Sequence, residues 1–231
     1  MKFSQELVKG KLIKRYKRFL TDIELEDGSI IVAHTNNSGS MISCIEEGAQ
    51  VMLSPANNSK RKTQFSWEMI FINNNWIGVN TMIPNQLIAE AIKNNEIEGL
   101  KGYTIVKREV KFEDSRLDVY AENDTEKCFI EVKNVSMRVG DGALFPDAVT
   151  SRGLKHLETL IRIKKQGIRA IMIYVIQRMD VNFFGTAKHI DPNYSKALQR
   201  AIKEGIEVFP IQAKVSPQEI IISRILPFNK E

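Results

Sequence analysis

The sequence predicts a two-domain protein in which a small β-barrel is followed by a mixed α/β sheet flanked by helices. Residues 1–82 alternate between short apolar runs and turn residues, which is typical of an all-β domain. Residues 83–231 alternate instead between strand-like apolar runs and runs with a helical period, which indicates a sheet covered by helices. A chain of 231 residues is long enough for two such domains.

Short strands are expected along the whole first domain. Asp27-Gly28 predicts a tight hairpin turn, and Asn73-Asn74-Asn75 predicts a second turn between strands. Strands of this length and spacing favour a small barrel of the oligonucleotide-binding kind, although another small β domain would have the same strand count. The expected strands are residues 7–16, 21–26, 30–33, 51–54, 65–72 and 76–79.

Two basic clusters in this domain lie beside aromatic residues. Bases stack on aromatic rings while cations meet phosphates, so both clusters are candidate contacts for nucleic acid. Aromatic residues in strands are also commonly core residues, and lysines in strands are commonly solvated, so this alternative stays open. The first cluster is Lys14, Arg15, Tyr16, Lys17 and Arg18, followed by Phe19; the second is Lys60, Arg61 and Lys62, followed by Phe65 and Trp67.

Helices and strands alternate in the second domain. Pro84 suits the first turn of a helix that ends near Asn94. Two further helices are expected at residues 150–166 and 192–204, because each apolar stripe is followed by a closing glycine. The expected strands are residues 103–112, 116–120, 129–133, 170–176, 206–210 and 219–225, of which 170–176 is apolar enough to be buried on both faces.

Charged residues interrupt two of these apolar strands. Asp118 lies in one strand, Glu131 and Lys133 lie in the next, and residues 123–126 form the turn between them. Because strand side chains alternate, Glu131 and Lys133 share a face, and a hairpin would bring Asp118 beside them. Two carboxylates and an ammonium on one face are typical of a Mg²⁺ site with a water-orienting lysine. The alternative is a set of solvated polar groups.

Five motifs occur in a fixed order along the chain and resemble those of the sugar fermentation stimulation protein family, over essentially its whole length. The resemblance implies an N-terminal oligonucleotide-binding barrel, a C-terminal domain like the PD-(D/E)xK nucleases, DNA binding, and a link to sugar (maltose) utilisation. The motifs are Ser115-Arg116-Leu117-Asp118, Glu131-Val132-Lys133-Asn134-Val135, Phe145-Pro146-Asp147-Ala148-Val149-Thr150, Arg152-Gly153-Leu154-Lys155-His156-Leu157 and His189-Ile190-Asp191.

The chain departs from the family pattern in two places. Leu117 stands where the nuclease signature usually has proline before its first aspartate. The family's His-Cys-Pro-Asn-Thr-Gly motif reads His34-Thr35-Asn36-Asn37-Ser38-Gly39 here, so any role of that cysteine does not transfer.

The resemblance assigns roles to the charged residues. Asp118 and Glu131 are expected to ligate Mg²⁺ or Mn²⁺, with the Val132 carbonyl as a further ligand, and Lys133 is expected to orient the attacking water. Glu109, in the preceding strand, is a candidate outer ligand or general base. Arg152 and His156 share a helix face and are candidate phosphate contacts, although His156 packing beneath the sheet, and an Asp147–Arg152 ion pair, are alternatives. The remaining candidates are Arg116, Asp147, Gln177 and His189.

Three functional classes follow from these residues. The first is a Mg²⁺-dependent nuclease that acts on single- or double-stranded DNA, or on RNA. The second is a catalytically inactive DNA-binding regulator, and the third is a structural module. Paired carboxylates repel phosphate unless a metal is present, which favours the nuclease over the binder. The basic–aromatic clusters argue against the structural module.

Composition limits the setting in which the protein works. The net charge of +5 and pI of about 9.1 mildly favour an anionic partner. No apolar run reaches membrane length, and the N-terminal residues lack the apolar core of a signal peptide. Two cysteines, Cys44 and Cys128, suit a reducing compartment, so we expect a cytoplasmic protein without a membrane partner. A homo-oligomer is left open.

Overall fold

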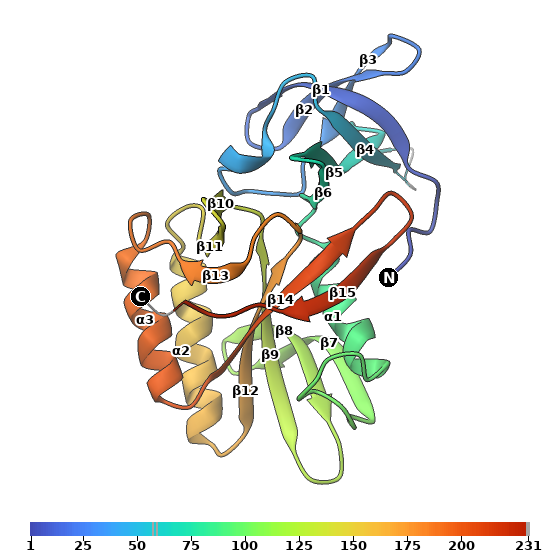
Figure 1. Cartoon of the computed structure of the whole chain (residues 1–231). Coiled ribbons are helices and arrows are strands. Elements are labelled where there is room, and N and C mark those ends of the chain that lie inside the picture. The colour runs from blue at the N-terminus through green and yellow to red at the C-terminus, as the bar shows by residue number, and fades with distance from the viewer. Residues whose placement is uncertain (57, 59, 230–231) are drawn as a thin grey trace.

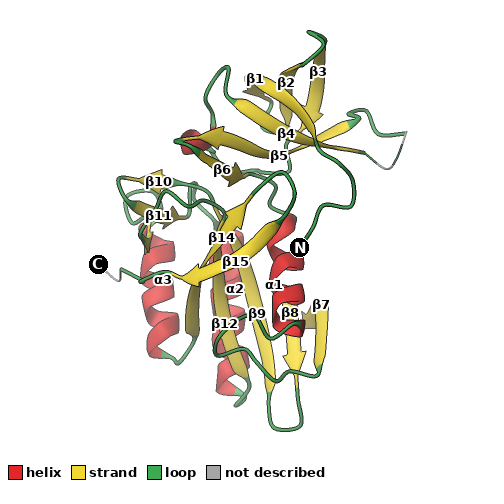
Figure 2. Cartoon of the chain, turned by 45° about the vertical axis from the view of Figure 1, so that its right-hand side comes forward, coloured by secondary structure: helices red, strands yellow, loops and turns green. Residues whose placement is uncertain are grey.

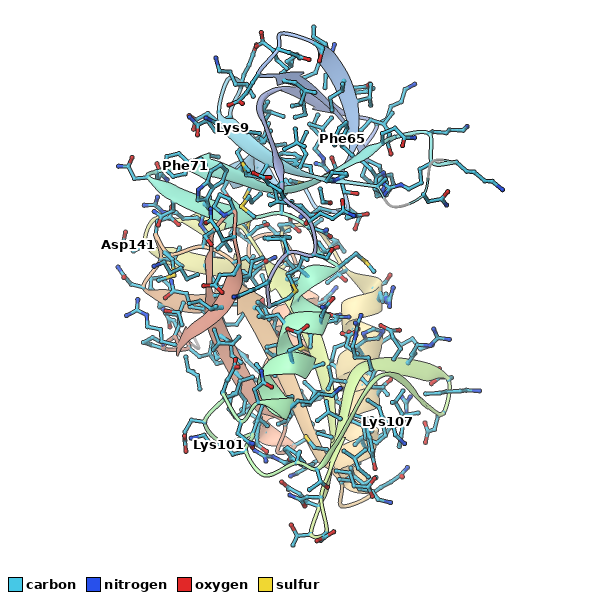
Figure 3. The ribbon with its side chains drawn as sticks, turned by 90° about the vertical axis from the view of Figure 1, so that its right-hand side faces the viewer. Lys9, Phe65, Phe71, Lys101, Lys107 and Asp141 are labelled. Atoms are coloured by element: carbon cyan, nitrogen blue, oxygen red, sulfur yellow. The ribbon has the colours of Figure 1, made fainter. Side chains whose placement is uncertain are left out.

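The computed structural model of the chain describes residues 1–56, 58 and 60–229, and it contains two domains stacked along one axis (Figure 1). The first domain forms the upper part of the view and the second, larger domain lies beneath it. In Figure 3, Lys9, Phe65 and Phe71 mark the barrel, whereas Lys101 and Lys107 mark the far part of the second domain.

The first domain is a closed five-stranded barrel. Its strand order is β3-β2-β1-β4-β5, and a parallel pairing of β3 with β5 closes it, which is the order of an oligonucleotide-binding barrel. Trp67 lies fully buried at its centre and donates its ring N–H to the Met69 carbonyl at 3.0 Å. The strands are β1 (Val8–Tyr16), β2 (Leu20–Leu25), β3 (Ile30–His34), β4 (Gln50–Pro55) and β5 (Phe65–Ile72), with β6 (Asn75–Gly78) paired to β5.

The second domain is a six-stranded mixed sheet with helices on both faces (Figure 2). The central strands β9, β12 and β14 are parallel, and the outer strands are antiparallel to their neighbours. One core packs α1 against the sheet, and the other packs α2 and α3 against the opposite face. In the order β15-β14-β12-β9-β8-β7, the strands are Ile220–Ile225, Glu207–Val215, Arg169–Ile176, Lys127–Val135, Ser115–Glu122 and Ile105–Phe112.

The helices begin where their capping residues place them. α1 (Ile83–Lys93) has a proline in its first turn. α2 (Ser151–Lys165) is capped by Thr150, whose side chain accepts the Gly153 N–H, and α3 (Pro192–Lys203) is capped by Asp191, which accepts the Tyr194 N–H. No helix within the described residues combines the length and the apolar composition needed to cross a membrane.

Three features differ from the sequence expectation. A small sheet of β10 (Arg138–Val139), β11 (Gly142–Phe145) and β13 (Phe183–Thr186), and a 3₁₀ turn at Ile42–Cys44, were not expected, because segments of two to four residues carry no readable period. β14 was expected to end at Pro210 but continues to Val215. Pro210 has no N–H, yet its carbonyl accepts the Leu226 N–H at 2.8 Å, so the strand continues through it.

The two domains meet over an apolar contact, in which Met52 and Met69 of the barrel join the core around α1, and over a polar, buried contact. Arg178 is 1% exposed and donates to the Ser136 carbonyl at 2.6 Å and to the barrel residue Ser43 at 3.2 Å. The Gly78 N–H of β6 donates to the Gln177 carbonyl at 2.9 Å. The N-terminal amine of Met1 also lies against the second domain, where it donates to the Ile220 carbonyl at 3.0 Å. The domain boundary that the sequence predicts at residue 82 remains a prediction.

Candidate functional site

A cleft of about 590 Å³ lies between the barrel and the second domain. Its lining brings together Asp118 of β8, Glu131 and Lys133 of β9 and, from the barrel, Arg18. A second hollow, of about 630 Å³, lies at the turn end of the sheet, around the ion-paired Arg169. We place the functional site in the first cleft, because Glu131 is buried there and has an oxygen without a partner among the described residues. The carboxylates Glu122, Glu126 and Glu207 of the second hollow are instead ion-paired with lysine or arginine.

The neighbouring strands β8 and β9 separate beside Asp118. Their backbone pairing ends at Val119 opposite Ile130. Beyond that pair, the Val132 N–H donates to the Asp118 carboxylate at 2.8 Å, so a side chain replaces a strand carbonyl as the acceptor. Asn85, in the first turn of α1, donates to the other carboxylate oxygen at 2.7 Å. The separated strands thus hold the Asp118 carboxylate at the opening of the sheet.

The edge strand β7 is distorted at the same level. Glu109 lies opposite Asp118 in the register and has a φ of 55°, a left-handed conformation that is unfavourable for glutamate. Val106 packs against the core that contains α1, whereas Val110, four residues later, packs against the opposite core. The strand therefore turns its side chains over at Glu109, which also lines the cleft. Distortion of this kind is concentrated at functional sites.

Glu131 is the most buried charged group of the site, at 1% exposure. Its Oε1 accepts a hydrogen bond from Lys133 Nζ at 2.5 Å and another from His156 Nδ1. Arg152 Nε lies 3.5 Å from His156 Nε2, so the donor–acceptor pattern favours the imidazole tautomer that carries its proton on Nδ1. Among the described residues, Oε2 of Glu131 is buried and has no hydrogen-bond partner.

The two carboxylates have pKa values displaced in opposite directions. Burial, reinforced by the Glu131 charge, raises the pKa of Asp118 to about 7. Burial also acts to raise the pKa of Glu131, but the Lys133 ammonium and His156 outweigh it, so that pKa lies below its ordinary value. The environment of Glu131 therefore favours its ionised form, whereas a bound cation would be needed to favour the ionised form of Asp118.

These residues fit a divalent metal ion. A buried carboxylate oxygen without a partner is costly unless a ligand satisfies it, and Glu131 Oε2 is such an atom. Among the described residues, no group of three or more His, Cys, Asp and Glu side chains could hold a metal. A two-carboxylate set still suits Mg²⁺, which commonly keeps waters and substrate phosphates as its other ligands.

Comparison with known proteins identifies the family. A profile described as the sugar fermentation stimulation protein RE domain matches residues 82–219, and one described as the SfsA N-terminal OB domain matches residues 13–79. The chain belongs to the sugar fermentation stimulation protein family. The family resemblance and the fold class predicted from the sequence are therefore confirmed.

Individual relatives share almost the whole chain. A sugar fermentation stimulation protein homolog of Desulfotalea psychrophila is 46% identical over 93% of this chain and 92% of its own length. A homolog of Geobacter metallireducens is 42% identical over 98% of this chain and 99% of its own length. The solved structure of Pyrococcus furiosus SfsA in complex with Ca²⁺ is 24% identical, with a TM-score of 0.90, and covers 99% of this chain and 98% of that one. It shows the same fold.

Within this family member, several predicted residues take positions other than those expected. His156 was a candidate phosphate contact, but it is 5% exposed and bonded to Glu131, so it orients that carboxylate instead. The alternative Asp147–Arg152 ion pair is absent among the described residues. Asp147 accepts the Met41 N–H of the barrel at 3.2 Å, and Arg152 lines the cleft in the first turn of α2.

Three further candidates lie at the margin of the cleft or away from it. Gln177 is fully buried and donates to Asn134 at 2.7 Å, so it packs in the domain contact rather than facing the cleft. Arg116 is exposed and forms an ion pair with Glu109 at 3.8 Å. His189 is exposed and is not part of the cleft lining.

In the predicted basic clusters of the barrel, some residues hold neighbouring loops and others lie exposed in turns. Arg15 donates to three main-chain carbonyls of the loop after β3, the shortest at 2.8 Å to Asn37, and therefore holds that loop. Lys14 lies 3.7 Å from Asp22 and 5.8 Å from the Tyr16 ring centroid. Lys17 and Arg18 form the exposed turn after β1, and Lys60, Arg61 and Lys62 lie in the loop between β4 and β5.

Asn85 of the cleft and Arg178 of the domain contact are residues whose contacts no sequence signal indicated. Asn85 follows the proline of a helix start, a position that ordinarily calls for no partner elsewhere in the chain. Asn85 and Asp118 are 33 positions apart in the sequence, so a local sequence pattern cannot predict their contact. Arg178 follows a buried strand, where arginine ordinarily marks the return to solvent.

The protein without metal is expected to lose stability as the pH rises. The pKa of Asp118 is raised from 3.8 to about 7 on folding, so the folded state binds this proton more tightly. The resulting stabilisation is complete below pH 3.8 and is lost as the pH rises through about 7. Thermal unfolding in EDTA across this window should show the decline in the wild type, and a weaker decline in Asp118→Asn. Parallel pH profiles for the two proteins would contradict the assignment.

Proposed function

We propose that this chain is a Mg²⁺- or Mn²⁺-dependent nuclease that hydrolyses DNA phosphodiesters in the cleft between its two domains. One observation carries the proposal. Glu131 is almost fully buried, has an oxygen without a partner among the residues that the structure describes, and shares the cleft with Asp118 and Lys133. A site that served only to grip phosphate would gain nothing from two carboxylates at its centre.

The residues of the cleft divide the work. A bound divalent cation would polarise the phosphodiester and lower the pKa of a water molecule. Asp118 and Glu131 would hold the cation, and Asn85 and the Val132 N–H fix the Asp118 carboxylate in place. His156 fixes the Glu131 carboxylate, so it is a positioning residue.

The cations of the cleft suit the phosphate. The Lys133 side chain is 15% exposed, so its ammonium reaches the cleft while it donates to Glu131. From there it would orient the attacking water or stabilise the charge that develops on the phosphoryl oxygens. Arg152 adds a second cation at the start of α2, where the helix dipole also favours an anion. Glu109, exposed beside Asp118, would accept a proton from the water.

The relatives agree with this chemistry. The structure of the Pyrococcus furiosus protein holds Ca²⁺, a cation that takes oxygen ligands as Mg²⁺ does. The barrel has the strand order of oligonucleotide-binding domains, which use the β1–β2 and β4–β5 loops to contact nucleic acid. The first loop carries Lys17 and Arg18, and the second carries Lys60, Arg61 and Lys62. The link to sugar utilisation would then run through DNA, in the cytoplasm, where the two buried free cysteines stay reduced.

Metal-activated cleavage is the direct test. The purified protein is incubated with single-stranded DNA, duplex DNA and RNA, each with Mg²⁺, with Mn²⁺ and with EDTA. We expect cleavage of DNA with either metal and none with EDTA. Salt-sensitive binding without cleavage of any substrate would overturn the proposal and leave a DNA-binding regulator.

A further inference from the structure

The turn between β1 and β2 has a strained backbone that the rest of the barrel holds in place. Lys17 and Arg18 have φ values of 47° and 65°, so two successive residues with side chains are left-handed. Arg15 Nε donates to the Arg18 carbonyl at 3.0 Å, and the Thr35 N–H donates to the Phe19 carbonyl at 2.9 Å. Two left-handed residues in succession suit a tight hairpin turn, and the contacts on both sides fix the position of this turn.

This turn presents Arg18 to the cleft. Arg18 is exposed and lines the same space as Asp118 and Glu131. Within the described part of the chain it forms no ion pair, whereas its neighbour Arg15 is bound to loop carbonyls. The barrel therefore offers an unpaired cation opposite the carboxylates, at the place where a bound strand would carry its phosphate.

Phe19, the next residue, offers an aromatic surface beside that cation. Its side chain is 42% exposed, and its ring stacks on His34 with centroids 6.1 Å apart and planes 19° apart. Val32, on the same face of β3 as His34, is 40% exposed. This pair, in which Phe19 is exposed and His34 half-buried, lies on the β2–β3 side of the barrel, where oligonucleotides bind in such folds. Bases of any sequence stack on such rings.

We propose that Arg18, Phe19 and His34 form a binding site for one unpaired nucleotide of single-stranded DNA on the barrel side of the cleft. Arg18 binds the phosphate, and Phe19, supported by His34, stacks on the base. This site rests on the proposed function and defines its substrate, because a base within a duplex is already stacked on its neighbours and cannot stack on Phe19. A strand held in this way passes from the barrel into the cleft that contains Asp118.

Binding measured in EDTA tests the site separately from cleavage. Fluorescence anisotropy follows a labelled single strand and the matching duplex, and a strand with 2-aminopurine reports stacking by quenching of its emission. We expect Phe19→Ala to weaken single-strand binding about tenfold, to leave duplex binding unchanged and to remove the quenching. Phe19→Trp should restore both signals. Ile30→Ala, which removes a more exposed apolar side chain at the start of β3, is the control and should bind as the wild type does.

Three results would overturn the inference. They are single-strand binding by Phe19→Ala equal to that of the wild type, equal losses for single strand and duplex, and a loss confined to single-stranded RNA. The nuclease proposal fails on a different measurement, the absence of metal-activated cleavage by the wild type. A protein that cuts nothing but needs Phe19 for single strands would retain this site and lose the proposed activity.

Discussion

Asp118→Asn is expected to reduce metal-dependent cleavage at least about 100-fold, a loss typical of removing one electrostatic group from an active site. The asparagine oxygen can still accept the Val132 N–H, so the separated strands should keep their arrangement. What is lost is one of the two negative charges that would hold the cation. Cleavage rates at saturating Mg²⁺, together with metal affinity by calorimetry, measure the effect.

The same substitution is expected to stabilise the protein without metal. Burial raises the pKa of Asp118 to about 7, so above that pH the folded protein holds an unfavourable charge. A neutral asparagine removes that cost, by up to about 4 kcal/mol, since each pKa unit corresponds to about 1.4 kcal/mol. Lost activity combined with gained stability is the signature of a residue kept for function.

Asp124→Asn is the matched control, because Asp124 is an exposed carboxylate in the turn of the same hairpin. It should leave both cleavage and stability unchanged. Full activity in Asp118→Asn would show that this carboxylate does not hold the metal, and lower stability above pH 7 would show that it is structural.

The paired carboxylates of the site could be predicted because they follow a local rule. Glu131 and Lys133 share a face through strand alternation, and a hairpin turn brings Asp118 to their level. The alternation of residues along the strands did not predict that β8 and β9 separate beside Asp118. The separation of β8 from β9 depends on a side chain replacing a backbone acceptor, and on Asn85 from a helix far along the chain. Such contacts are made by tertiary packing, so a sequence period does not show them.

His156 and Arg152 illustrate the same limit. They lie four residues apart on one helix face, as the sequence predicted. In the structure His156 contacts Glu131 beneath the cleft, whereas Arg152 lines the cleft itself. The orientation of α2 about its own axis is set by its apolar residues, such as Leu157 and Leu160, which pack on the sheet. A shared face predicted that the two would be neighbours, and the packing of the helix decided their separate roles.

Arg178→Ala is expected to cause the largest loss of stability, about 3 kcal/mol, which is typical of removing one partner from a buried ion pair. Arg178 is 1% exposed and binds Asp180 at 2.7 Å, as well as Ser43 of the barrel. Burial acts to raise the pKa of Asp180, but the hydrogen bonds and charge of Arg178 outweigh it and lower that pKa to about 2. Without Arg178, the Asp180 charge would lose its main buried partner and the domains would lose a shared donor.

Arg138→Ala is the matched control. Like Arg178, Arg138 forms an ion pair with Asp180, at 3.1 Å, but its side chain is 30% exposed; Asn73 donates to the same Asp180 oxygen. Its loss should cost less than about 1 kcal/mol, as for other partly solvated pairs. Urea unfolding followed by Trp67 and Trp76 fluorescence reports the barrel side of the contact, and far-ultraviolet circular dichroism reports the whole chain. In Arg178→Ala the two transitions should separate, since the barrel then unfolds without the second domain. Coincident transitions, with a loss no greater than that of Arg138→Ala, would mean that the domains are held by their apolar contacts and that Arg178 only fills space.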